Sequence, residues 1–313
     1  MTRDTRPLAI AIMGPTASGK TAFAVDCALR FNTEIISVDS ALVYRGLNIG
    51  AAKPDSATLA LAPHRMIDIR DPHEVFSAAD FASEAMPHLL ELSRQGKIPL
   101  LVGGTGLYFR ALLQGLSAMP AADEAVRLEL KAEAERLGWP VMHEQLKAID
   151  PLSAAKIHPN DPQRILRALE IFQLSGKNRS DWQRESEPPP FPFRVLQLVL
   201  APADRAVLHQ RIAARFEQML EQGFLDEMRA LMQNPKLHPD LPSMRAVGYR
   251  QAWQHLSGET DFNTFREQTI AATRQLAKRQ LTWFRSVEFS HWLDPHSQVD
   301  ALNYALRDFT GRV

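Results

Sequence analysis

Residues 14–21, Gly-Pro-Thr-Ala-Ser-Gly-Lys-Thr, constrain this chain more than any other stretch, because they fill every fixed position of the phosphate-loop pattern G-x-x-x-x-G-K-[ST]. An apolar run, Leu8 to Met13, comes before them and a helical pattern over 22–30 follows. This is the strand–loop–helix context in which the pattern works. The alternative, an ordinary glycine turn with a surface lysine, leaves those flanks unexplained. We therefore predict a site for a di- or triphosphate.

The residue types of the loop suit an anion. Glycines let successive backbone N–H groups turn inward, and a helix start adds unpaired N–H groups and partial positive charge. Lys20 supplies a mobile positive charge, and Thr21 supplies a hydroxyl suited to bound Mg²⁺. We predict that the di- or triphosphate is bound by Gly14, Pro15, Thr16, Ala17, Ser18, Gly19, Lys20 and Thr21, with Thr21 as the magnesium ligand.

Composition excludes several classes of protein. The 36 basic and 36 acidic residues cancel, so any nucleic-acid surface must be local. The single cysteine, Cys27, cannot form an internal disulfide, and as a small packing residue it fits a reducing cytosol. No apolar run reaches the roughly 18 residues of a membrane helix. An N-terminal signal peptide is rejected, because its apolar stretch would run straight into the phosphate loop. No zinc pattern is present, and we predict a cytoplasmic protein without membrane contact.

The first 110 residues alternate strand and helix patterns. We predict strands over 8–13, 34–38, 66–69 and 99–102, and helices over 21–30 and 78–95, the latter starting at a Ser77/Asp80 capping box. Such alternation predicts an α/β fold, a phosphate-loop parallel sheet flanked by helices, with the ligand at the carboxyl ends of the strands.

The pattern changes near residue 120. Helical patterns over 123–137 and 163–174, with no strand pattern, precede a stiff connector of four prolines within 188–192. A strand is expected over 193–200, and from Asp204 onward the chain reads as helical, punctuated by Gly223 and Gly248. We predict a core over 1–119, an all-helical insertion domain over 120–192, and a core continuation with helical C-terminal region over 193–313.

Two strand ends have residues suited to chemistry. Asp39 ends the second strand, where a carboxylate could hold Mg²⁺ or act as a general base, but it could equally cap the following turn. The fourth strand ends in glycines and a threonine, Gly103-Gly104-Thr105-Gly106, which allow a ligand to approach the backbone closely. The acidic residue that usually ends a Walker-B strand is absent there, which argues against an ordinary ATPase.

Basic residues gather in three places. Arg211 and Arg215 lie four apart on one helix and suit a pyrophosphate charge, although a solvated helix face is the simpler interpretation. Arg164 and Arg167 lie three apart in the insertion. Between residues 245 and 285 there are seven Lys or Arg and three Asp or Glu, interleaved with aromatic residues. Charge with flat rings suits looped or single-stranded RNA, so together the clusters favour a nucleic-acid ligand.

These motifs, taken in order along nearly the whole chain, resemble those of the bacterial tRNA dimethylallyltransferase (IPP transferase) family. The blocks that carry the resemblance lie at 14–21 (Gly-Pro-Thr-Ala-Ser-Gly-Lys-Thr), 37–41 (Ser-Val-Asp-Ser-Ala), 103–108 (Gly-Gly-Thr-Gly-Leu-Tyr), 163–167 (Gln-Arg-Ile-Leu-Arg), 245–250 (Arg-Ala-Val-Gly-Tyr-Arg) and 278–285 (Lys-Arg-Gln-Leu-Thr-Trp-Phe-Arg). The phosphate loop alone is shared with many kinases, whereas the blocks together are far more specific.

The resemblance implies transfer of a dimethylallyl group from dimethylallyl diphosphate to N6 of adenosine 37, next to the anticodon of tRNAs that read codons beginning with U. It implies Asp39 as the acceptor of the N6 proton, and Lys20, Thr21 with Mg²⁺, and Arg215 as stabilisers of the departing diphosphate. Since that adenosine is stacked in its loop, base flipping is also implied. The positions that match tRNA contacts in the family are Asp39, Ser40, Ala41, Leu42, Thr105, Arg127, Gln163, Arg164, Ile165, Leu166, Arg167, Arg245, Ala246, Val247, Gly248, Tyr249, Arg250, Lys278, Arg279, Gln280, Leu281, Thr282, Trp283, Phe284 and Arg285.

Two other functions fit part of the sequence. An ATP-dependent nucleoside or small-metabolite kinase would use the phosphate loop with Arg211 and Arg215 equally well, and the insertion would be its lid. It would leave the basic-aromatic tail and the pair Arg164 and Arg167 without a purpose. A nucleotide-dependent RNA-binding switch would need no catalytic Asp39. The expected partners are the tRNA anticodon stem-loop and dimethylallyl diphosphate, for a monomer without an obligate protein partner.

Overall fold

A computed structural model describes residues 4–294, 302, 303 and 306 of the chain. It divides into two compact units, one formed by the residues up to 114 together with those from 191 on, the other by residues 115–190. The sequence expectation for the second unit is 120–192. Within the described residues, every helix is too short or too polar to cross a lipid bilayer.

The first unit is built on a six-stranded sheet in which each neighbouring pair of strands is parallel. Met13 pairs with Gly103, and Gly103 also pairs with Val38, so three central strands end side by side. The predicted α/β class with a parallel sheet is confirmed. In the order β3-β2-β4-β1-β5-β6, the strands are β3 His64–Arg65, β2 Ile35–Val38, β4 Leu100–Gly103, β1 Leu8–Met13, β5 Arg194–Leu200 and β6 His291–Leu293.

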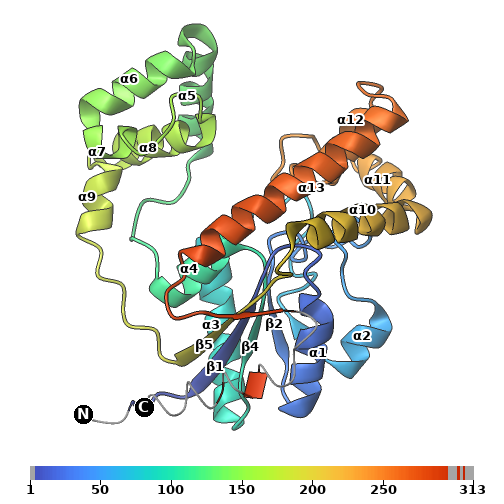
Figure 1. Ribbon diagram of the computed structural model, residues 1–313. Helices are drawn as coiled ribbons and strands as arrows, with labels where there is room; N and C mark the ends of the chain where they lie inside the picture. Colours follow the sequence, from blue (N-terminus) through green and yellow to red (C-terminus); the bar gives the residue numbers. More distant parts are fainter. Residues whose placement is uncertain (1–3, 295–301, 304–305, 307–313) are drawn as a thin grey trace. The chain divides into compact units, whose positions relative to one another are not determined.

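Alternation along the strands produces two hydrophobic cores, one on each face of the sheet. Ala11 and Met13 of β1 point into the first core, and Ile10 and Ile12 point into the second. Helices α3 (Ala78–Arg94) and α4 (Gly106–Gln114) contribute to the first core, and α1 (Lys20–Arg30) contributes to the second (Figure 1). Cys27 on α1 is buried there, and burial raises the pKa of its thiol to about 12, which supports a packing role.

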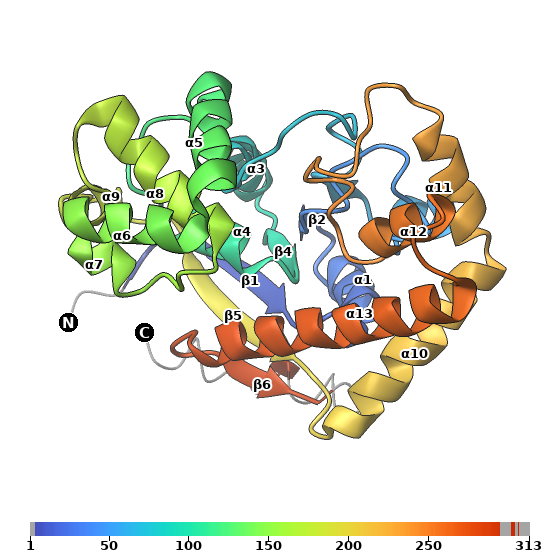
Figure 2. The ribbon, with the colours of Figure 1, turned by 90° about the horizontal axis from the view of Figure 1, so that it is seen from above.

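Local sequence signals explain where the helices of this unit begin. The Ser77/Asp80 capping box is present at the start of α3, as predicted. Gly19 and Gly223 adopt left-handed backbone at the N-caps of α1 and α11, with φ of 90° and 94°. The helices are α1 Lys20–Arg30, α2 Ser56–Leu61, α3 Ala78–Arg94, α4 Gly106–Gln114, α10 Arg205–Glu221, α11 Phe224–Met232, α12 Tyr249–Leu256 and α13 Phe262–Arg285. Figure 2 shows α10 and α13 side by side, and they share a small apolar core of their own.

Two sequence predictions about this unit are wrong. Residues 66–69 are not a strand, because Met66 and Asp68 adopt left-handed backbone with φ of 65° and 56°. Residues 66–69 instead run alongside the loop after β2, and the Ile69 amide donates a hydrogen bond to the Val43 carbonyl there at 2.9 Å. The chain beyond Asp204 is not wholly helical either, since β6 adds an edge strand that pairs with β5. Three residues are too few to give a recognisable sequence pattern.

The second unit consists of helices, and all its residues are described. Its apolar core includes Leu130, Met142, Leu146 and Ile165. Side chains of aspartate cap three helices, since Asp123, Asp150 and Asp161 each accept a hydrogen bond from an amide three residues later. The helices are α5 Glu124–Leu137, α6 Trp139–Ile149, α7 Pro151–Ala154, α8 Pro162–Ser175 and α9 Arg179–Arg184.

Candidate active site

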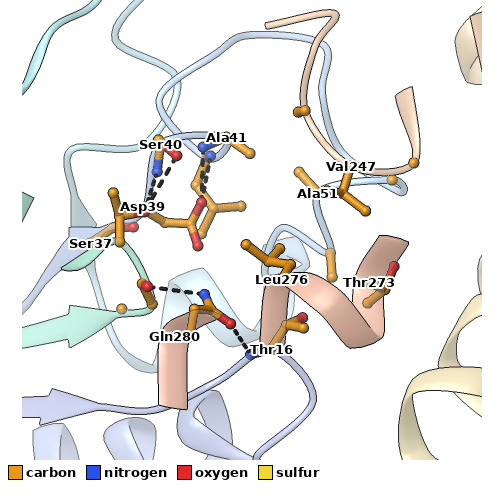
Figure 3. A pocket seen from close by; sticks show the side chains of 18 of the residues that line it. Thr16, Ser37, Asp39, Ser40, Ala41, Ala51, Val247, Thr273, Leu276 and Gln280 are labelled. Atoms are coloured by element: carbon orange, nitrogen blue, oxygen red, sulfur yellow. Dashed lines mark hydrogen bonds between the residues drawn. The ribbon is translucent and has the colours of Figure 1, made fainter. Parts of the chain in front are cut away.

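A cavity of about 660 Å³ lies at the carboxyl ends of the central strands of the first unit. Residues that follow β1, β2 and β4 line it, as expected for a ligand site in a parallel sheet. Helices α10 and α13 and the segment 242–249 close it from the other side. In Figure 3, Asp39 and Ser40 lie on one side of this cavity, Ala51 and Val247 on the opposite side, and Thr16 with Gln280 below them.

The phosphate loop has the backbone form that its sequence predicts. It connects β1 to α1 through left-handed backbone at Ala17 and Gly19, with φ of 61° and 90°. Gly19 is the N-cap of α1 and provides no side-chain hydrogen bond to the first turn. A helix start of this kind is suited to bind an anion. Thr16, Ala17, Lys20 and Thr21 line the cavity, so the loop faces the same space as Asp39.

Lys20 is held inside the loop that it serves. Its Nζ donates a hydrogen bond to the Pro15 carbonyl at 2.8 Å. Burial lowers the pKa of Lys20 to about 8, opposed by the charge of Asp39 and reinforced by that of Arg215. A lysine with such a pKa is still mostly cationic at neutral pH, and an incoming diphosphate would raise its pKa again.

Arg215 and Arg211 do not act as a pair. Arg215 projects from α10 into the cavity, where burial lowers the pKa of its guanidinium and the charge of Asp39 opposes that shift. Arg211, one turn earlier on α10, is not among the residues that line the cavity. The interpretation of Arg215 as part of a solvated helix face is therefore wrong. Leu208, Ile212 and Phe216 bury one side of α10, and Arg215 lies beside this buried stripe.

Asp39 caps the turn after β2 and also lines the cavity, so the chemical role that the sequence predicts for it stays a prediction. Its Oδ1 accepts hydrogen bonds from the amides of Ala41 at 2.9 Å and Leu42 at 3.4 Å, so it caps the turn after β2. The same carboxylate lines the cavity and is close enough to Lys20 and Arg215 to influence the pKa of each. Among the described residues, no hydrogen bond engages Oδ2, which can therefore accept a proton from a ligand.

The glycine-rich end of β4 permits close packing within the chain itself. A Cβ on Gly103 would lie 2.0 Å from the Val38 carbonyl oxygen, and one on Gly106 would lie 2.5 Å from the Trp283 ring. The same glycines line the cavity, so the sequence interpretation that they let a ligand approach the backbone stays a prediction. Thr105 ties this strand end to the loop that follows Asp39, since its Oγ1 accepts a hydrogen bond from the Ser40 amide at 3.0 Å.

Two cavity residues have a place that the sequence did not predict: Gln280 was expected to contact tRNA, and Ser37 was not singled out as a site residue. Gln280 of α13 joins the phosphate loop to the end of β4: Oε1 accepts from the Thr16 amide at 2.9 Å, and Nε2 donates to the Gly104 carbonyl at 3.0 Å. Ser37 lines the cavity with a buried hydroxyl that has no hydrogen-bond partner among the described residues. Such an orphaned hydroxyl suits a polar ligand. The sequence signal that could have identified Ser37 as a cavity residue is its position on β2, two residues before Asp39.

A second, smaller groove of about 220 Å³ lies between α10 and α13. Its floor is apolar, and its basic lining residues are exposed on both helices. They are Arg205 and His209 of α10 and Arg274 and Lys278 of α13. Arg205, Arg274 and Lys278 form no ion pair with another described residue, so the groove carries uncompensated positive charge.

Comparison with known proteins decides the family. The sequence model of a family described as IPP transferase matches residues 42–287. The chain is 56% identical over 314 residues to the tRNA dimethylallyltransferase of Stenotrophomonas maltophilia (strain R551-3), covering 99% of both chains. It is 55% identical over 317 residues to that of Xanthomonas campestris pv. campestris (strain 8004), covering 100% of this chain and 97% of that protein. The chain belongs to the IPP transferase family.

Solved structures agree with this membership, and the family resemblance of the sequence motifs is confirmed. The full-length tRNA isopentenylpyrophosphate transferase of Bacillus halodurans is similar with a TM-score of 0.69 and 38% identity, covering 98% of this chain and 95% of that one. A eukaryotic dimethylallyltransferase acting on tRNA is similar with a TM-score of 0.78 and 28% identity, covering 98% of this chain and 80% of that one.

The residues expected to contact tRNA in the first unit fall into three groups. Arg245, Ala246, Val247 and Gly248 line the cavity with Asp39, Ser40, Ala41, Leu42, Thr105, Arg279, Gln280 and Trp283. Arg250, Lys278, Thr282 and Arg285 are exposed. Tyr249, Leu281 and Phe284 are buried, at 0%, 7% and 0% exposure, although Tyr249 still lines the cavity and Leu281 the second groove.

In the second unit, two of the arginines expected to contact tRNA donate hydrogen bonds to a buried carboxylate. Arg127 donates to Glu170 Oε1 at 2.8 Å, and Arg167 donates to Glu170 Oε2 at 2.6 Å. Glu170 is fully buried; burial by itself raises the pKa of its carboxyl, but the hydrogen bonds from Arg167 and Arg127 hold that pKa below its ordinary value. Ile165 and Leu166 are also buried, whereas Gln163 and Arg164 are exposed. Nothing in the sequence pattern distinguished Arg127 and Arg167 from surface arginines.

Proposed function

We propose that this protein transfers a dimethylallyl group from dimethylallyl diphosphate to N6 of adenosine 37 in tRNAs that read codons beginning with U. Membership of the IPP transferase family and the names of its tRNA dimethylallyltransferase relatives support the reaction class. The observation that carries the proposal is that Asp39, the phosphate loop and Arg215 line one cavity. This arrangement supports a ligand whose diphosphate lies on the loop while Asp39 faces its acceptor.

In this proposal the diphosphate lies on the phosphate loop. The C1–O bond of the donor breaks, a bond forms between C1 and N6, and diphosphate leaves. Lys20 and Arg215, with the loop amides, stabilise the negative charge that grows on the leaving group. Asp39 Oδ2 takes the N6 proton once the new bond makes that proton acidic. The hydroxyl of Ser37 and the aromatic rings of Tyr108 and Trp283 complete the cavity wall.

The residues present fit a magnesium ion. The Thr21 hydroxyl lines the cavity and is an oxygen ligand of the kind that Mg²⁺ prefers. No group of three or more His, Cys, Asp or Glu side chains gathers among the described residues, so the remaining ligands would be diphosphate oxygens and water. When bound, the ion would supply positive charge to the leaving diphosphate.

Base flipping would bring the adenosine beside Asp39, because a stacked base cannot reach a cavity at the strand ends. The exposed basic residues of α13 and of segment 245–250 would hold the anticodon stem-loop. The helical unit 115–190 would grip the same RNA, through Gln163 and Arg164 rather than through Arg127 and Arg167. Magnesium, these RNA contacts and a cytoplasmic location are part of the proposal.

One assay separates this function from its rivals. Purified protein, unmodified tRNA and Mg²⁺ are given either dimethylallyl diphosphate labelled in the allyl group or ATP labelled in the γ-phosphate. We expect label in tRNA only from the first donor, at the N6 position of adenosine 37 after nuclease digestion. Transfer of γ-phosphate to a small molecule would instead indicate a kinase, and RNA binding without any transfer would indicate a switch.

A further inference from the structure

Four consecutive amides in the loop over residues 48–51 converge on a side-chain pair from α11 and α12. The amides of residues 48, 49 and 50 donate to the carboxylate of Glu227 at 3.0, 2.7 and 3.2 Å. The amide of residue 51 donates to the Tyr249 hydroxyl at 3.1 Å, and that hydroxyl donates to Glu227 at 2.7 Å. A loop whose successive N–H groups point one way is an anion-binding nest. Here the anion is a side chain of the protein.

The loop is also fixed from its other side. It closes on itself, because the amides of Ala52 and Lys53 donate to the carbonyls of Ile49 and Asn48, each at 2.9 Å. A Cβ on Gly50 would lie 2.3 Å from the Phe224 ring and 2.7 Å from the Tyr249 ring, so the backbone packs directly on aromatic side chains. The loop is therefore held by residues of α11 and α12, and Lys53 also ties Asn48 to the Tyr44 carbonyl in the segment after β2.

The loop over residues 48–51 forms part of the cavity wall, although Glu227, which holds the loop, does not line the cavity. Gly50, Ala51 and Ala52 line the cavity, and so does the segment 245–249 that contains Tyr249. Figure 3 shows Ala51 beside Val247, across the cavity from Asp39. Glu227 lies behind this wall and is outside the lining. Glu227 bonds both the loop over residues 48–51 and Tyr249, so it determines how this loop meets the segment 245–249 on the side of the cavity opposite Asp39 (Figure 3).

We propose that Glu227 is a positioning residue for tRNA in the reaction described above. It holds the wall that an adenosine beside Asp39 would face, and it links that wall through Tyr249 to segment 245–250. This inference rests on the proposed function. The donor diphosphate lies on the phosphate loop, which Glu227 does not contact, so the effect of Glu227 falls on tRNA and not on dimethylallyl diphosphate.

The test uses Glu227→Gln in the full chain. A glutamine keeps the size of the side chain, but it loses one acceptor oxygen and turns an NH2 group toward amides that also donate. Removing such bonds from partly buried donors predicts about a tenfold rise in KM for tRNA. We expect kcat and the KM for dimethylallyl diphosphate to change less than about twofold, because Lys20, Asp39 and Arg215 stay in place. Glu227→Asp, which keeps the charge, should restore part of the loss.

Asp226→Asn is the matched control. Asp226 neighbours Glu227 in the first turn of α11, is exposed, and pairs only with Arg229 among the described residues. The control removes the same charge from the same helix end and should leave both KM values unchanged. Tyr249→Phe keeps the ring beside Gly50 but removes the hydroxyl, and it should raise the KM for tRNA by a smaller factor, about threefold.

Hydrogen exchange provides a readout that does not need catalysis. The amides of residues 48–51 should exchange slowly in the wild type and faster in Glu227→Gln, while α11 keeps its protection. Unchanged exchange at 48–51 would overturn the clamp, and faster exchange with an unchanged KM for tRNA would overturn the positioning role. If Glu227→Gln also loses protection across α11, the variant has disturbed the helix itself. Hydrogen exchange at residues 48–51 and the KM for tRNA, measured on Tyr249→Phe, then decide whether the clamp positions tRNA. A wild type that fails to prenylate tRNA would contradict the proposed function, with the exchange result still deciding the clamp.

Discussion

Gln280, near the C-terminal end of α13, holds Thr16 in the phosphate loop, with 2.9 Å between its side-chain oxygen and the Thr16 amide nitrogen. The other end of the same amide group reaches the Gly104 carbonyl at the end of β4. One side chain thus joins the helix proposed to bind tRNA to the loop proposed to bind diphosphate. Because a side-chain amide carries both a donor group and an acceptor group, one glutamine can make both bonds at once.

Gln280→Ala removes both bonds and should loosen the phosphate loop. Two lost hydrogen bonds predict roughly a tenfold rise in KM for dimethylallyl diphosphate. Gln268→Ala, at an exposed position three turns earlier on α13, is the control and should behave like the wild type. Steady-state kinetics with saturating tRNA measures the effect, and equal KM values for the two variants would show that the bridge has no part in donor binding.

The pKa of Lys20 predicts how donor use depends on pH. The cation is the form that binds diphosphate, and burial lowers the pKa of Lys20 to about 8 in the free protein. As pH rises through about 8, the cation is lost, so kcat/KM for dimethylallyl diphosphate should fall toward a tenfold loss per pH unit. Lys20→Arg stays charged across this range and should show a lower but flat profile. A wild-type profile that is flat between pH 7 and 9.5, in rate measurements at constant ionic strength, would refute the role of Lys20.

The groove between α10 and α13 is expected to bind RNA phosphates. Arg274→Ala and Lys278→Ala should each weaken tRNA binding and lower the slope of log affinity against log salt by about one. Arg229→Ala on α11 removes a charge that is already paired with Asp226, and should change the slope little. Filter binding at several salt concentrations gives the slopes. Identical slopes for all four proteins would exclude this groove as an RNA surface.

Glu170 should stabilise the helical unit independently of catalysis. Glu170→Gln leaves two arginines and the Asp123 amide without their carboxylate, which predicts a loss of about 1–3 kcal/mol in the free energy of unfolding. Because folding lowers the pKa of Glu170, its contribution is present above its ordinary value of 4.5 and is lost as pH falls below it. Urea titration of wild type and variant at pH 7 and pH 4 measures this, and a difference that does not shrink at low pH would contradict the account.

Much of the fold follows from local sequence patterns. The phosphate loop needs a buried strand before it and a helix after it, and both signals are present around residues 14–21. Alternating apolar residues in β1 and β5 and the capping box at Ser77 are equally local. The strand expected at 66–69 failed because two left-handed residues there are stabilised by contacts with the loop after β2, which no local pattern reveals.

The candidate site is harder to predict, because its geometry depends on contacts distant in sequence. Arg211 and Arg215 have the same sequence pattern, yet only Arg215 reaches the cavity. Arg127 and Arg167 match a pattern associated with RNA contact, but their partner is Glu170, which the sequence did not single out. Gln280 lies 264 residues from the amide it holds. Such pairings depend on how helices pack, which single-sequence periodicity does not specify.

The central claim is that Asp39 accepts the N6 proton beside a phosphate loop that holds the leaving diphosphate. Its most direct test is a single-turnover measurement of prenyl transfer to tRNA by the wild type and by Asp39→Asn, with tRNA affinity measured for both. Asparagine can still accept hydrogen bonds from the Ala41 and Leu42 amides, so the turn is kept while the base is lost. The account predicts a rate lower by about 10²- to 10⁴-fold with tRNA affinity within about twofold. A variant that transfers the group at the wild-type rate would contradict it.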